Sequence, residues 1–233
     1  MSPPTGYATS VFINCPFDQE FLGMKRAMIF ALAFSGLEVR IATESSDSGE
    51  VRCQKILALI QASRFSVHDI SRMSPGGEPR YNMPFELGLD LGLRYGPSPQ
   101  FDDKLCLVLD SEPYRYRRYF SDISGQDIRD HQNDPERLVK VLRGWLQATL
   151  EKRLPGPTSI WESYSRFQAF FRRETNLAGW KAEDLIEMED PEYLLWVQDF
   201  LQQEEVGAVL SGGGNPAEEG FSSDLQEKDA SEN

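Results

Sequence analysis

Short apolar runs alternate with longer helical patterns over residues 9–111, and this alternation constrains the fold more than any other feature of the chain. Four runs have the length and composition of buried strands, at residues 10–15, 39–43, 65–70 and 105–109. Helical patterns lie between them, over about 19–35, over about 50–62 and around Glu86. Strands that alternate with helices predict a parallel sheet with helices on both faces.

A fifth strand is predicted over residues 126–131, and a strong helix follows from about 134 to 150. The expected fold class is therefore α/β, with a flavodoxin-like parallel sheet of about five strands, helices on both faces and a C-terminal helical extension. Right-handed crossovers place the loops that follow the strands along one edge of such a sheet. Ligands of open α/β sheets bind at that edge.

The chain divides into three regions by composition. We expect residues 1–132 to form the α/β domain and residues 133–204 to form a helical extension that packs on the domain or makes an oligomer interface. Two helical segments of this extension carry aromatic residues at helical spacing, which is typical of a core or of a helix–helix interface. Residues 205–233 lose the apolar pattern and are rich in Asp, Glu and Ser, so we expect a disordered tail.

Charge and cysteine content limit the partners and the compartment. The net charge of −13 and the pI of about 4.7 argue against sequence-independent binding to nucleic acid, which needs clustered Lys and Arg. Cys15, Cys53 and Cys106 lie in apolar runs without metal-ligand spacing, and this indicates buried, reduced thiols of a cytosolic protein. No signal peptide and no apolar run of roughly 18 residues is present. We expect a cytoplasmic protein that binds neither nucleic acid nor membrane.

The stretch 80–89 places an acid near the start of a helix. Pro84 is favoured in a first helical turn, with Asn82 or Met83 as the expected cap, and Glu86 then falls in that turn beside unpaired backbone N–H groups. The helix dipole favours an ionised carboxylate there. Two glycines four residues apart leave one face of this helix open to close approach. The alternative interpretation is an acid that helps to cap a helix packed tightly on the sheet.

Four loops are expected to meet at the ligand-binding edge, and each supplies polar groups. The second loop runs straight into a helix, so its backbone N–H groups can hold a phosphate, although ordinary helix caps have the same composition. The candidate substrate-binding residues are, loop by loop, Asn14, Pro16 and Asp18; Asp47, Ser48 and Gly49; Asp69, Ser71 and Arg72; and Tyr81 and Asn82 beside the candidate catalytic residue Glu86.

A groove with Asp69, Glu86, Asn82 and Arg72 suits cleavage or transfer at an N-glycosidic bond. Such reactions pass through an oxocarbenium-like state that a nearby carboxylate stabilises or captures. The sequence contains no serine nucleophile elbow, P-loop or dinucleotide-binding glycine pattern. Its two histidines are far apart in sequence, so we expect no metal site, and His68 is expected to point into the sheet.

Several of these segments, in this order, resemble a bacterial TIR (Toll/interleukin-1 receptor) domain. They are Val-Phe-Ile at 11–13, Asp-Ser-Gly-Glu-Val at 47–51, the run 56–67 with its Ile-Gln-Ala-Ser-Arg, and Pro-Phe-Glu-Leu at 84–87. In that family a loop after the second strand precedes a helix, and a Glu on a later helix is catalytic. The segments 12–17 and 85–88 also resemble nucleoside 2-deoxyribosyltransferases, which are relatives of the same architecture.

The resemblance implies an NAD+-consuming or nucleotide-consuming glycosidase, in bacteria often the effector or signal-producing arm of antiphage defence. It implies that Glu86 is the catalytic glutamate, that the 47–49 loop flanks the nicotinamide pocket and that Asp69 lies near the sugar or base. NAD+ would then be the substrate, with no separate cofactor, and a homodimer or higher homo-oligomer is expected. Two alternatives stay open: a TIR-like nucleotide-sensing or assembly module without turnover, and a deoxyribosyltransferase-like enzyme.

Overall fold

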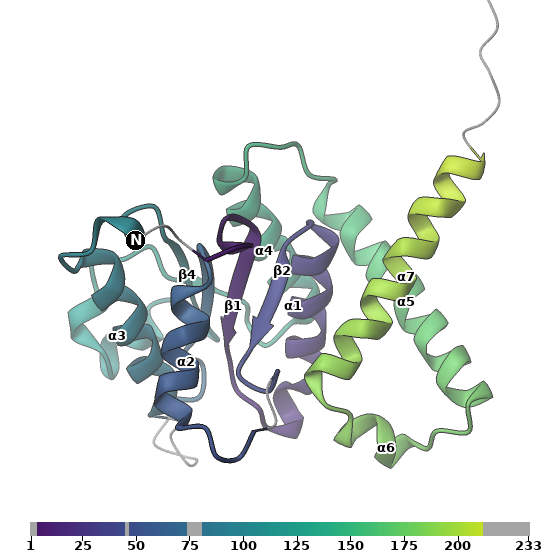
Figure 1. Cartoon of the computed structure of the whole chain (residues 1–233), viewed down its shortest axis with the longest axis horizontal. Helices are drawn as coiled ribbons and strands as arrows, with labels where there is room; N and C mark the ends of the chain where they lie inside the picture. Colours follow the sequence, from purple (N-terminus) through teal and green to yellow (C-terminus); the bar gives the residue numbers. More distant parts are fainter. Residues whose placement is uncertain (1–3, 45–46, 74–80, 212–233) are drawn as a thin grey trace, which may run out of the picture.

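A five-stranded, all-parallel sheet in the order β2-β1-β3-β4-β5 forms the centre of the protein (Figure 1). The computed structural model describes residues 4–44, 47–73 and 81–211, with side chains described up to residue 205. This order and the helices on both faces confirm the predicted flavodoxin-like α/β fold. The strands are β1 (Ser10–Asn14), β2 (Glu38–Ile41), β3 (Phe65–Asp69), β4 (Leu105–Asp110) and β5 (Arg129–Asp130).

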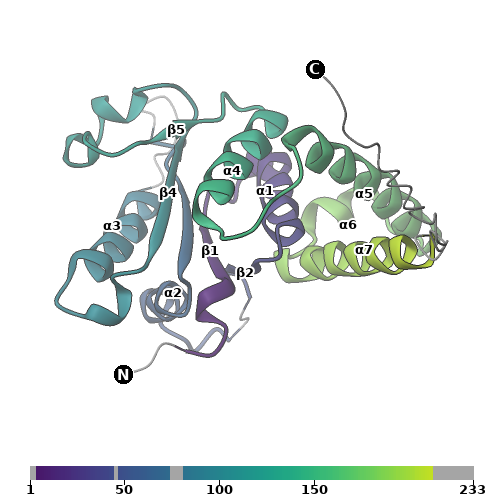
Figure 2. The same ribbon diagram turned by 90° about the horizontal axis from the view of Figure 1, so that it is seen from above.

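Two helices cover each face of the sheet (Figure 2). On one face α1 (Leu22–Phe34) and α4 (Pro135–Thr149) pack together, and on the other α2 (Arg52–Gln61) lies beside α3 (Asn82–Tyr95). Side chains of β1 alternate between these layers, because Val11 and Ile13 join the α1–α4 core whereas Phe12 packs against α2. Since both faces are covered, every residue of β1 and β3 is buried, including the polar residues Ser66, His68 and Asp69 of β3.

The C-terminal helices form a further layer outside α1. They are α5 (Pro157–Leu177), α6 (Ala182–Glu187) and α7 (Asp190–Ser211). The ring of Phe30 on α1 lies 5.3 Å from that of Phe167 and 6.3 Å from that of Phe200, measured between centroids. The aromatic stripes of this region therefore pack in a core that continues from the α/β domain. Helix α7 runs to Ser211, past the expected start of the tail at 205, and residues 212–233 lie outside the described part of the chain.

Several boundaries differ from the sequence-based expectation. Helix α3 begins at Asn82 with Tyr81 in the N-cap position, so Pro84 is its third residue and Glu86 falls just beyond the first turn. Pro is tolerated there because the first N–H groups of a helix have no intrahelical partner. The fifth strand is much shorter than the predicted 126–131, because only Arg129 and Asp130 pair with β4, while Asp127 is exposed and Ile128 packs against the cluster around Leu87. Short 3₁₀ turns cover Tyr7–Thr9, Gln19–Phe21, Pro99–Phe101, Arg115–Arg118 and Ser121–Ile123.

The thiols are all free, but they are not equally buried. Cys15 is buried and Cys106 is half-buried, whereas Cys53 is exposed, so the expectation of a buried thiol was wrong for Cys53. Cys53 lies in the first turn of α2, where its neighbours in sequence are polar and face the solvent. In the described part of the chain, no helix is both long and apolar enough to cross a membrane.

Candidate active site at the carboxyl edge of the sheet

The strand order places a switch point between β1 and β3, because the connections that follow these two strands leave in opposite directions. Asn14 ends β1, and Ser71 follows β3 on the adjacent side. Both residues are buried, and Asn14 Oδ1 and Ser71 Oγ have no hydrogen-bond partner among the described residues. Buried polar atoms normally have a hydrogen-bond partner. Two unpaired oxygens at the carboxyl edge of the sheet therefore mark a place where a ligand or water can bind.

Glu86 is buried at this edge, with 5% of its surface exposed. It lines a pocket of about 250 Å³ together with Arg52, Cys53 and Ile56 of α2 and with Asn82 and Phe85 of its own helix. Burial raises the pKa of the Glu86 carboxyl above its usual value. The charge of Arg52 and a hydrogen bond from Asn82 act in the opposite direction and favour the carboxylate.

Asn14 fixes the start of the helix that carries Glu86. Its Nδ2 donates to the carbonyl oxygen of Met83 at 2.9 Å and lies 3.0 Å from Nδ1 of His68. A carbonyl oxygen only accepts, so the amide nitrogen must face Met83, and its second hydrogen is donated to the histidine ring. His68 then carries its proton on Nε2, which donates to Asp90 Oδ2 at 3.0 Å. A neutral imidazole satisfies both hydrogen bonds.

Asp90 lies beneath this histidine in a closed polar network. It also accepts a hydrogen bond from the Ser66 hydroxyl, and Lys104 Nζ lies 3.1 Å from its Oδ1. Although burial alone would raise the pKa of Asp90, these partners bring it down to about 2. His68, Asp90 and Cys106 present ligand atoms within 4.8 Å of one another. The ammonium of Lys104 already supplies the cation that this carboxylate needs, so the cluster is an internal ion-pair network.

Asp69, at the end of β3, is fully buried and has two donors of its own. His131 Nε2 lies 2.9 Å from Asp69 Oδ2, and the backbone N–H of Ser71 donates to Oδ1 at 2.9 Å. The other ring nitrogen of His131, Nδ1, accepts from the backbone N–H of Asn133. The ring is therefore the Nε2–H tautomer, and both oxygens of Asp69 are occupied within the protein.

Arg72 joins the loops that follow β1 and β3. Its guanidinium contacts Asp18 through two nitrogens at 3.2 Å and reaches Glu20 at 3.3 Å. Asp18 also caps the 3₁₀ turn through the backbone N–H of Phe21, and the neighbouring Pro16 is buried. These residues thus brace the edge of the sheet.

The loop before α2 lies on the surface. Asp47, Ser48 and Gly49 are exposed, and Asp47 Oδ1 accepts the N–H of Gly49 at 2.8 Å. Tyr81 is 70% exposed at the start of α3. Of the predicted site residues, the structure thus brings Asn82 directly to Glu86, while Asn14 supports the same helix from β1.

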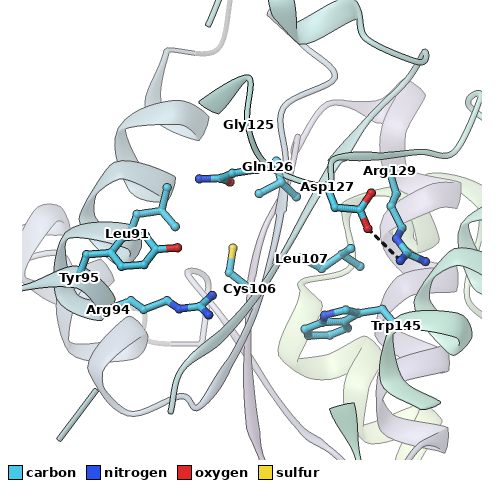
Figure 3. Close-up of a pocket in the computed structure, with 11 residues that line it drawn as sticks. Leu91, Arg94, Tyr95, Cys106, Leu107, Gly125, Gln126, Asp127, Arg129 and Trp145 are labelled. Atoms are coloured by element: carbon cyan, nitrogen blue, oxygen red, sulfur yellow. Dashed lines mark hydrogen bonds and ion pairs between the residues drawn. The ribbon is translucent and has the colours of Figure 1, made fainter. Parts of the chain in front are cut away.

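Sequence reasoning missed Arg52 and Cys53, which line the pocket opposite Glu86. Their position directly after the expected phosphate-binding loop was a usable signal, because a helix that starts at the ligand edge presents its first turn to the ligand. A second cavity, of about 350 Å³, lies farther along α3 between that helix and α4 (Figure 3). It shares no lining residue with the Glu86 pocket. Comparison with protein families, with characterised proteins and with solved structures gave no match.

Proposed function

We propose that this protein is an N-glycosidase that cleaves the nicotinamide–ribose bond of NAD+ or a related nucleotide, with Glu86 as the essential carboxylate. One observation carries the proposal. Among the described residues, the buried carboxylates other than Glu86 each lie within 3.1 Å of a basic side chain; they are Asp69, Asp90, Asp110 and Asp190. Glu86 has no such partner and faces a pocket. A buried acid that faces a pocket and whose pKa is raised by desolvation is a candidate functional residue.

The reaction makes modest demands on the protein. As the C1′–N bond breaks, its electron pair leaves with nicotinamide as a neutral molecule, so no acid is needed to protonate the leaving group. The ribose carbon becomes oxocarbenium-like, and the carboxylate of Glu86 stabilises that positive charge or captures it. Water then adds its oxygen to C1′ and releases one proton, which gives ADP-ribose from NAD+.

Arg52 and Asn82 have complementary roles in this proposal. The guanidinium of Arg52, on the other wall of the pocket, suits a phosphate next to the ribose. Asn82 hydrogen-bonds Glu86 and holds the carboxylate in position. The resemblance to bacterial TIR domains supports the same assignment, and with it a role as an effector or signal-producing homo-oligomer of antiphage defence.

The size of the pocket favours a second candidate. At about 250 Å³ it lies below the ~300–1,000 Å³ of pockets that enclose a drug-sized ligand, so it suits a ribose and its base better than a whole dinucleotide. A nucleoside 2-deoxyribosyltransferase-like enzyme would need a pocket only large enough for a ribose and its base. In that reaction the C1′–N bond would break with its electron pair leaving on the first base, which takes up a proton, while Glu86 captures C1′ covalently. The second base would then displace the carboxylate from C1′ and lose one proton.

Glu86→Gln tests the catalytic assignment, with turnover measured on NAD+ and on 2′-deoxynucleosides. Gln keeps the shape and removes the charge, so turnover should fall by roughly 10²–10³ or more, the scale of one preorganised electrostatic group. Thermal stability should be retained, because burial already disfavours the charged form. The exposed Glu183→Gln serves as the matched control. Full turnover in folded Glu86→Gln would overturn the proposal.

The wild-type substrate profile separates the candidates. Release of nicotinamide identifies the glycosidase, and base exchange between nucleosides identifies the transferase. Saturable nucleotide binding without turnover would instead indicate a sensing module. Because the reaction needs ionised Glu86 and its pKa is raised, activity should be lost as the pH falls through a value above the ordinary 4.5. An acidic limb at or below that value would contradict the role of Glu86.

A further inference from the structure

Among the described residues, no strand pairs with the outer edge of β4 over residues 105–108. Five of its residues pair with β3, but only Leu109 and Asp110 pair with β5. The N–H of Leu105 donates to Arg64 O, and Leu109 O accepts from Ile70, so the odd-numbered residues bond to β3. Backbone groups alternate in direction along a strand. The backbone N–H and C=O groups of Cys106 and Val108 therefore point to the other edge of β4. Strand β5 pairs only with Leu109 and Asp110 at that edge, so it does not cover Cys106.

A groove of about 350 Å³ lies along this edge. Leu91, Arg94 and Tyr95 of α3 line one wall, and Trp145 of α4 lines the opposite wall (Figure 3). The segment 125–127, which leads to β5, passes along a third side. The groove thus occupies the place that the first half of a longer β5 would take.

The two walls match the alternation of side chains in an extended chain. Cys106 and Val108 pack on the α3 side with Leu91, whereas Leu107 packs on the α4 side with Trp145. A strand added beside them would place every second side chain against α3 and the others against Trp145. The four residues Leu105–Val108 give an edge of about 13 Å, at roughly 3.3 Å per residue.

Charge defines the side chains that fit. Arg94 lies over the Tyr95 ring, 5.4 Å from its centroid, and forms no ion pair among the described residues. Arg129 stands at the end of the groove, where it pairs with the exposed Asp127. An acidic side chain on the α3 side would meet Arg94, and an apolar one on the other side would meet Trp145. The segment 125–127 bounds the groove on its outer side.

We propose that the open edge of β4 binds an extended segment of a partner protein in which acidic and apolar residues alternate, as an added strand of the sheet. Backbone hydrogen bonds supply the affinity in this mode of recognition, and the pockets for alternate side chains supply the specificity. The groove is separate from the Glu86 pocket, so the proposal does not rest on the catalytic assignment.

The test uses the full chain and a fluorescent, N-acetylated hexapeptide of alternating Asp and Val, followed by anisotropy at low salt. Two further peptides carry N-methyl groups on the Asp nitrogens or on the Val nitrogens. Because N–H groups alternate in direction along a strand, only one of the two methylated peptides should lose affinity, by at least about tenfold. If the peptide were held only by non-specific attraction of its Asp residues to basic side chains, the two methylated peptides would bind with equal affinity.

Variants locate the binding site on the protein. Gly125→Leu should abolish binding by filling the groove, and it should fold normally because a Cβ at Gly125 meets no atom within 4 Å. Arg94→Gln should weaken binding, whereas the exposed Arg153→Gln should not. The proposal is overturned if the wild type shows no saturable binding up to millimolar peptide, if both methylated peptides bind equally, or if folded Gly125→Leu binds as well as the wild type.

Discussion

Replacing Lys104 by Met tests the buried ion pair beneath the candidate site. Lys104 Nζ lies 3.1 Å from Asp90 Oδ1 and donates to the carbonyl oxygen of Ile60 at 2.8 Å. Met keeps an unbranched side chain but removes the charge and the donors, so Asp90 is left buried without its cation. Removing one partner of a buried ion pair costs about 3–5 kcal/mol. The free energy of unfolding of Lys104→Met should fall by that amount at neutral pH.

The pH dependence gives a second signature. Burial would raise the pKa of Asp90, but His68, Ser66 and Lys104 lower it from 3.8 to about 2. Because the folded-state pKa is the lower one, the carboxylate stabilises the fold above pH 3.8, and this contribution is lost as the pH falls towards 2. The difference corresponds to about 2–3 kcal/mol. The destabilisation by Lys104→Met should therefore shrink over the same acidic range, where Asp90 takes up a proton.

Urea unfolding followed by tryptophan fluorescence and circular dichroism measures both effects. Lys140→Met is the matched control, because Lys140 forms an exposed ion pair with Glu136 at 2.7 Å. Its loss should change the free energy of unfolding by less than about 0.5 kcal/mol. A change below about 1 kcal/mol in Lys104→Met would refute the reasoning, since the buried carboxylate would then not depend on the ammonium.

Three further predictions concern the aromatic core, the outer helices and the thiols. Phe167→Ala should lower the free energy of unfolding, measured with urea, by about 3–5 kcal/mol, because the ring is fully buried. Leu177→Ala, at an exposed position, should change it by less than about 0.5 kcal/mol. Asp190→Asn should speed hydrogen exchange in α7, because the carboxylate pairs with a buried lysine of α1 at 2.6 Å, and unchanged exchange would contradict this. Iodoacetamide at pH 8 should modify exposed Cys53 before Cys106, whose pKa is raised to about 12 by burial and a nearby carboxylate; peptide mass mapping identifies the first site.

The sheet could be predicted because most of its strands are covered on both faces. Strand β1 contains the apolar run 11–13, and every one of its residues is buried. Where burial is partial the signal fails. Before β5 only Ile128 is apolar and Asp127 is exposed, so the pattern that predicted a strand over 126–131 overestimated its length.

The site could be predicted only as far as local sequence determines it. Glu86 was identified from the Pro and Gly residues around it, which are its neighbours on one helix. Its opposite wall, Arg52, comes from another helix. Which carboxylates find donors within the protein also depends on distant contacts, since Asp69 accepts a hydrogen bond from a histidine 62 positions away. The sequence offered several equivalent acids, and only tertiary packing separates the paired ones from Glu86.

Asn14 shows how completely the nitrogen of one buried amide can be used by structural hydrogen bonds. The carbonyl of Met83 needs a donor, and so does Nδ1 of His68, and one amide NH₂ group serves both. An aspartate at this position would supply neither hydrogen and would set a third acid beside Glu86 and Asp90. The nitrogen of Asn14 is therefore committed to holding the helix that carries Glu86. Its oxygen remains unpaired among the described residues, so any contact with a substrate must come through that atom.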